Sequence, residues 1–166
     1  LDPFEDYGQL GTHGNWLAIV AAGDGSINTG VAPDASIVAV RAGTVFEHML
    51  GMDFCIDKIE NFNITAIQTA FGDIPIDNLP NTYCDDTQDP RFGPPALMTG
   101  LVNEAVSRGS VVIGATGQYP DRPGNLTNIA WPACIRNVTA VTGSTKPTPT
   151  EQIWITAHRN RNSITD

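Results

Sequence analysis

Apolar and polar positions follow two periods along the chain, and together they predict alternating strands and helices. Runs rich in β-branched residues predict buried strands at residues 36–41, 64–71, 110–116 and 138–143, and a weaker one at 152–157. Apolar residues at helical spacing predict helices over residues 13–22, 46–61 and 96–108. This alternation is typical of an α/β domain, so we expect a mainly parallel sheet with helices on both faces and right-handed crossovers.

The stretches between these elements are polar. Residues 1–12 predict an acidic surface loop, and residues 73–95 are dense in Pro, Asp and Asn, which predicts a long loop of the functional or mobile kind. Gly23-Asp24-Gly25 ends the first helix rather than opening one, which disfavours a nucleotide-binding loop. In parallel sheets the chemistry gathers at the carboxyl ends of strands, which are here residues 41–43, 70–72 and 115–118.

Composition narrows the class of protein. The chain has 166 residues, of which 41% are hydrophobic, enough for one globular domain with a sizeable core. Its formal net charge of -9 argues against nucleic acid or an anionic membrane as a partner. Apolar runs all fall well short of the ~20 residues that span a membrane. Because the first residue is Leu1 rather than Met, we expect a piece of a longer protein.

The three cysteines, Cys55, Cys84 and Cys134, cannot all pair within the chain. Their spacings fit no zinc pattern, and we expect neither a metal nor another cofactor. One disulfide with one free thiol is the economical interpretation, and three reduced thiols are the alternative. Only a disulfide would imply an oxidising compartment.

Three sequons for N-glycosylation occur, beginning at Asn63, Asn125 and Asn137. Asn63 and Asn137 adjoin predicted buried strands, whereas Asn125 stands in a loop rich in Pro and Gly. The sequence therefore favours Asn125 as the glycosylated residue.

Four segments together resemble the subtilisin-like serine proteases, or subtilases. They are His13-Gly14 with Gly30-Val31-Ala32-Pro33-Asp34-Ala35, then Ile67 to Gly72, Val111 to Gln118, and Asn137 to Val141. The match from His13 to Gly30 needs no gap and places His13 on the family's catalytic histidine. A rival register aligns Gly11-Thr12-His13 with the Gly-Thr-His triplet and puts Leu10 at the catalytic position, but it requires an insertion.

The resemblance implies a subtilisin-like fold and a polypeptide substrate or protein partner. It also implies roles for individual residues. Gln118 takes the oxyanion position, and the residues at the substrate-binding strand ends are Ala70, Phe71, Gly72, Ala115, Thr116 and Gly117. Some secreted subtilases carry a cysteine pair like Cys84 and Cys134, which implies a disulfide between these two, a free Cys55 and a secreted protein.

Much of the family's catalytic machinery has no counterpart in residues 1–166. The family's aspartate lies on a strand well before the histidine, and its serine lies in a Gly-Thr-Ser-Met-Ala segment that does not occur here. We therefore expect residues 1–166 to be the central portion of a subtilisin-like peptidase domain, incomplete in this chain. Another segment or chain would complete its sheet, between the strands predicted at 36–41 and 64–71.

Positions that are present also depart from the family pattern. Gln118 replaces the oxyanion asparagine; its extra methylene moves the amide by ~1.5 Å, whereas a useful donor sits ~2.7–3.1 Å from the oxyanion. Ile19 replaces a glycine, Ala70 a serine and Trp16 a second histidine. The shortened loop after Gly23 lacks the family's strong calcium site, although Asp24 and Asn28 leave weak binding open.

Two functional hypotheses follow. The first is a segment of a subtilisin-like serine endopeptidase domain, inactive as this chain. The second is a non-catalytic pseudoprotease that serves as a structural or protein-binding module.

Overall fold

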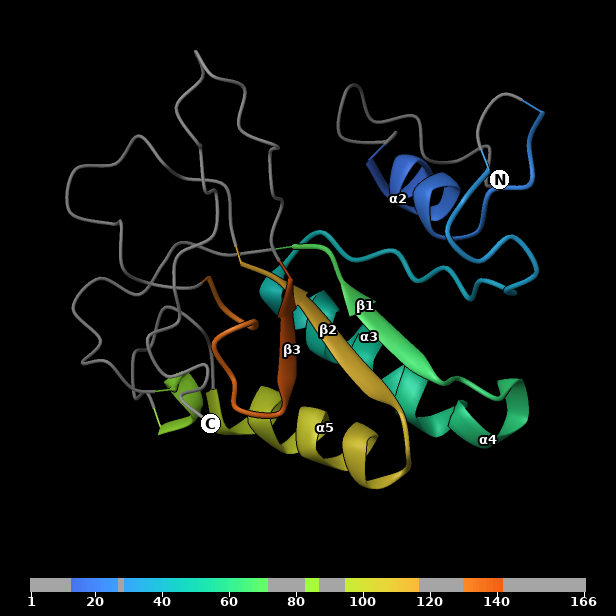
Figure 1. Cartoon of the computed structure of the whole chain (residues 1–166). Coiled ribbons are helices and arrows are strands. Elements are labelled where there is room, and N and C mark those ends of the chain that lie inside the picture. Colours follow the sequence, from blue (N-terminus) through green and yellow to red (C-terminus); the bar gives the residue numbers. More distant parts are fainter. Residues whose placement is uncertain (1–12, 27–28, 72–82, 87–94, 117–129, 142–166) are drawn as a thin grey trace, which may run out of the picture. The chain divides into compact units, whose positions relative to one another are not determined.

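The computed structural model describes residues 13–26, 29–71, 83–86, 95–116 and 130–141 (Figure 1). The chain forms two compact units, residues 1–40 and residues 41–166, and each is described by itself below. Among the described residues, no helix is long and apolar enough to cross a membrane.

Helix α2, His13–Ala22, lies in the described part of the unit 1–40. It is the helix that the sequence predicts, and it ends at the glycine-containing turn. Backbone amides of the following segment cover its last carbonyls: Val31 N donates to Val20 O at 3.0 Å, and Ala32 N donates to Ala21 O at 2.8 Å. The Gly-Val-Ala-Pro segment is thus the cap of α2, and it satisfies carbonyls that a helix end otherwise leaves open.

Gly30 is the position at which this cap requires a glycine. A Cβ built on Gly30 would lie 2.6 Å from Gly23 N and 2.7 Å from Ala22 N, both backbone atoms that cannot move aside. Gly30 N also donates to Gly23 O at 2.7 Å. The absence of a side chain is therefore what allows the cap to approach the helix.

The described residues of the unit 41–166 form three α-helices: α3, Val45–Asp57, α4, Ile59–Phe62, and α5, Pro95–Ser107. A capping box begins α3, because Thr44 Oγ accepts from Glu47 N while the Glu47 carboxylate accepts from the amides of Gly43 and Thr44. These hydrogen bonds, the one from Gly43 foremost, lower the pKa of Glu47. A short 3₁₀ helix, η1, Cys84–Asp86, lies within the predicted long loop.

Within the described ranges the sheet has three parallel strands in the order β1-β2-β3: β1 is Ala66–Thr69, β2 is Val111–Ala115 and β3 is Val138–Val141. Ile67 pairs with Val112, and Val112 pairs with Val138. These three residues share one face of the sheet and are buried. The opposite face carries exposed side chains such as Gln68 and Val111.

The core forms on the buried face, and it is one cluster. Met49, Met52 and Ile56 of α3 meet Met98, Val102 and Ala105 of α5 over the inward-facing residues of the strands. Segment 130–135 completes the cluster and includes Trp131. In this unit, therefore, α3 and α5 lie on the same face of the sheet, and this is the face whose side chains are buried.

The predicted α/β fold with a parallel sheet is confirmed, with shorter strands than the sequence indicates. The predicted helix over 46–61 is interrupted at Lys58, which separates α3 from α4.

The predicted buried strand at 36–41 is wrong: this stretch belongs to no strand and its side chains are exposed. No described strand pairs with it, and an isolated strand cannot satisfy its backbone groups internally. Residues 1–12, 152–157 and most of 73–95 lie outside the described part.

Gly114 offers a test of how closely this sheet packs. A Cβ at Gly114 would lie 2.9 Å from Val138 Cγ1 and 3.1 Å from the Ala133 Cα. We expect Gly114→Ala to lower the free energy of unfolding by about 1–3 kcal/mol through overpacking, measured by urea unfolding. The matched control is Gly100→Ala on α5, where the added Cβ meets nothing within 4 Å. It should raise stability by about 0.5–1 kcal/mol. Equal effects of the two substitutions would contradict the packing described here.

Candidate functional site

The carboxyl ends of β1 and β2 bring four of the predicted substrate-binding residues to the same end of the sheet. This end is called the candidate substrate edge below. Ala70 and Phe71 follow β1 directly, Ala115 ends β2, and Thr116 follows it. Since Thr69 pairs with Gly114, the two strands end in step. The parallel register alone therefore places these segments side by side.

Thr116 is held firmly at this edge. Its backbone N–H donates to Val141 O at 3.1 Å, and its carbonyl accepts from Ala130 N at 3.0 Å. The residue is 4% exposed. Its backbone groups thus join β2 to β3 and to the segment that precedes Trp131, which makes the strand end a rigid support.

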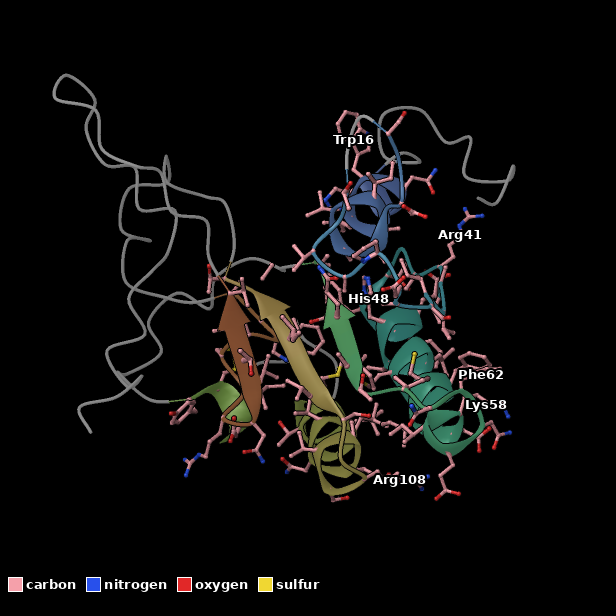
Figure 2. All side chains as sticks on the ribbon, turned by 45° about the vertical axis from the view of Figure 1, so that its right-hand side comes forward. Trp16, Arg41, His48, Lys58, Phe62 and Arg108 are labelled. Carbon is pink, nitrogen blue, oxygen red and sulfur yellow. A yellow bond between two sulfur atoms is a disulfide. The ribbon has the colours of Figure 1, made fainter. Side chains whose placement is uncertain are left out.

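Three aromatic side chains gather behind the end of β1. The rings of His48 and Phe71 stack with their centroids 3.4 Å apart and an interplanar angle of 15°, and Phe71 tilts against Trp131 at 5.9 Å. Trp131 is fully buried. Figure 2 shows His48 of α3 close to the carboxyl end of β1. The ring of Phe71 is therefore fixed between a helix and the core.

Sequence reasoning missed His48 and Trp131. His48 lies in the first turn of α3, where the helical spacing of apolar residues points to the buried methionines and not to a histidine. Trp131 lies in a segment whose apolar residues follow no period. The Trp-Pro-Ala-Cys run was the available signal for the second residue, since it leads into a predicted disulfide cysteine. Only the tertiary packing pairs either ring with Phe71.

His13 belongs to the other unit, in which it is the first residue of α2. Its side chain is exposed, and so are Trp16, at 69%, and Ile19, at 42%. A general base must lie within hydrogen-bond reach of the proton that it takes, and the exposed ring of His13 is open to such an approach. Figure 2 shows the Trp16 side chain on the same helix.

Several predicted site residues lie outside the described part of the chain: Gly72, Gly117, Gln118 and Asn125. Of the two residues considered for weak calcium binding, Asp24 is described and Asn28 is not. Within the described ranges, no group of three or more His, Cys, Asp or Glu side chains could hold a metal ion.

The predicted disulfide between Cys84 and Cys134 is present, with a Cα–Cα distance of 5.4 Å. It ties η1 to the segment before β3, and three further contacts accompany it. Cys84 N donates to Cys134 O at 3.1 Å, Arg136 N donates to Asp85 Oδ1 at 2.8 Å, and the Arg136 guanidinium lies 4.8 Å from the Tyr83 ring centroid. The disulfide is thus the centre of a local cluster.

Cys55 is the free cysteine, as expected, and it lies half-buried on α3. Burial raises the pKa of its thiol, because desolvation penalises the thiolate. A protonated thiol is a poor nucleophile, so Cys55 is a packing residue of the core rim.

The family model described as "Subtilase family" matches residues 1–164. The chain therefore belongs to the subtilase family.

Solved structures with the same fold include one described as "S41 Psychrophilic Protease", with 21% identity and a TM-score of 0.58, covering 85% of this chain and 43% of that one. Another is "Sphericase", with 20% identity and a TM-score of 0.57, covering 86% of this chain and 43% of that one. The chain thus spans less than half the length of these proteins. No curated protein matches it.

The disulfide generates a stability prediction. Because it closes a loop across a sequence separation of 50 residues, Cys84→Ala should lower the free energy of unfolding by about 4 kcal/mol on the chain-entropy model. Urea unfolding with and without a reducing agent measures this effect. The control is Cys55→Ala, which should leave the sensitivity to the reducing agent unchanged. A Cys84→Ala protein as stable as the oxidised parent would contradict the prediction.

Proposed function

We propose that residues 1–166 form the histidine-bearing segment of a subtilisin-like serine endopeptidase domain and do not hydrolyse peptide bonds by themselves. The observation that carries the proposal is the exposed His13 at the start of α2 in a chain whose family match runs from residue 1 to 164. In such a mechanism His13 takes the proton of a serine hydroxyl as general base. That serine and the orienting aspartate have no identified counterpart in this chain.

The substrate of the complete domain would be a polypeptide. The strand end at Ala70 and Phe71 would pair with the substrate backbone, and Ala115 and Thr116 at the end of β2 would bind it as well. The family resemblance gives Gly117 the same role. The rigid support of Thr116 and the aromatic stack behind Phe71 favour this assignment, since a binding edge must keep its geometry. Gln118 would stand at the oxyanion position.

A second candidate is a pseudoprotease, a module that keeps the fold and binds a protein without cleaving it. Substitutions at three positions favour it: Gln118 has one methylene more than the family's asparagine, Ala70 lacks the usual hydroxyl, and Ile19 adds bulk to the histidine helix. Loss of an oxyanion donor alone costs ~10²–10³ in turnover. These substitutions are independent of the length of the chain.

A further proposal concerns the sheet itself: another segment or chain pairs with the outer edge of β1. In the described residues β1 is an edge strand that pairs with β2 alone. An edge strand presents a row of unpaired N–H and C=O groups, which invites the addition of another strand. We also place the protein in a secretory or extracellular compartment, which the disulfide and the family favour.

Activity is tested with a fluorophosphonate probe, which labels an activated serine. We expect no labelling of residues 1–166 and no cleavage of an unfolded casein-like substrate, because a triad needs all three groups. Labelling that disappears in His13→Ala but persists in the surface control Asp53→Asn would overturn the proposal.

The same probe applied to the longest natural form separates the two candidates. Labelling that depends on His13 establishes a peptidase, and the absence of labelling in a folded protein establishes the pseudoprotease.

Sheet completion is tested by amide hydrogen exchange. In residues 1–166 alone, peptides covering β1 should exchange faster than in the longest natural form, since an open edge leaves outward amides unprotected. Peptides covering β2, which is paired on both sides, are the internal control. Equal protection of β1 in both forms, in a monomer that unfolds cooperatively, would refute the proposal.

A further inference from the structure

We propose that Asn63 is an N-glycosylation site of this protein. The sequon is Asn63-Ile64-Thr65, and a reading of the sequence alone disfavours it because a buried strand follows. In the structure, the nearby strand does not bury the sequon. Asn63 and Thr65 are both exposed, and only Ile64 between them turns inward, where it packs against the hydrophobic core.

The backbone at Asn63 explains this orientation. Asn63 ends α4 in the left-handed conformation, with φ 52° and ψ 50°, and its N–H donates to the Ile59 carbonyl. The amide of Ile64 also donates to Ile59 O, at 3.0 Å. Asparagine is among the few residues that adopt this conformation readily. The turn thus holds the Asn63 side chain toward solvent while the chain enters β1.

The side-chain amide of Asn63 makes no hydrogen bond to any other residue in the described part of the chain. By contrast, Asn137 Nδ2 donates to Asn103 Oδ1 of α5 at 2.8 Å. The next residue, Val138, is buried. A sugar on Asn137 would therefore have to fit against α5, whereas a sugar on Asn63 displaces nothing. The third sequon, at Asn125, lies outside the described residues.

The position of Asn63 is also compatible with the proposed function. Asn63 precedes β1, so it lies at the amino end of the sheet, and Figure 1 shows α4 at the end of β1 opposite the carboxyl ends. The four residues of β1 alone span roughly 13 Å at ~3.3 Å per residue, and Ile64 and Thr65 add to the separation between Asn63 and Ala70. A glycan there leaves the candidate substrate edge open, and the proposal does not depend on peptidase activity.

The modification is a group transfer with an oligosaccharide carried on a polyprenyl pyrophosphate as the donor. A bond forms between Asn63 Nδ2 and the anomeric carbon of the first sugar. The bond from that carbon to the pyrophosphate oxygen breaks, and the pyrophosphate leaves with the electron pair. Nδ2 loses one of its two protons, which passes to the solvent. The disulfide is consistent with passage through the oxidising compartment in which such donors are used.

The test uses the chain secreted from a eukaryotic host. Treatment with peptide N-glycosidase in heavy-oxygen water converts a glycosylated asparagine to a labelled aspartate, which peptide mass spectrometry locates. We expect the label at position 63. Asn63→Gln and Thr65→Ala should each remove one glycan from the intact mass, whereas the matched control Thr65→Ser preserves the sequon and should keep it.

Peptide mapping of the unsubstituted protein decides the matter even if a variant fails to fold. A secreted protein whose Asn63 peptide carries no label overturns the proposal, whether or not Asn125 or Asn137 is modified. Persistence of the label in Thr65→Ala would overturn it as well, because the modification would then be independent of the sequon.

Discussion

Burial of one face of the parallel sheet against α3 and α5 is the interaction on which the unit 41–166 depends. Ile67, Val112 and Val138 stand in register on that face, and methionines from both helices cover them. Each fully buried apolar side chain of this size stabilises the fold by about 1.5–3 kcal/mol, far more than an exposed ion pair such as Arg108 with Glu104. Packing, rather than surface charge, therefore sets the positions of the strands.

The geometry of the candidate substrate edge is a consequence of that packing. Parallel strands in fixed register end together, so Phe71 and Thr116 lie at one edge without any direct bond between them. The supports behind them are of different kinds. Phe71 stacks on His48 and makes a tilted contact with Trp131, while Thr116 is joined by backbone hydrogen bonds to β3 and to Ala130.

The histidine helix is stabilised in another way. In the unit 1–40, α2 has no buried residue, and the cap that covers its last carbonyls is formed by the segment that follows it. Local hydrogen bonds and the missing side chain of Gly30 therefore shape His13's helix, whereas long-range burial shapes the substrate edge. The two parts of the proposed peptidase machinery depend on different physical interactions, and a substitution can damage one without the other.

By itself, the sequence determined the features that are local or that carry a family signature. Neighbouring residues were enough to predict the helical period of α5, the β-branched run of β2 and the end of α2. They also showed the likeness of His13-Gly14 to the subtilase histidine segment. Likeness to the family also indicated the Cys84–Cys134 pair.

Tertiary structure decided what depends on distant partners. Residues 36–41 have strand composition but no described partner strand, His48 meets Phe71 only across the packed helix, and Asn63 is exposed because a left-handed turn precedes β1. Periodicity reports which face of an element is apolar, and it does not report which surface will cover that face.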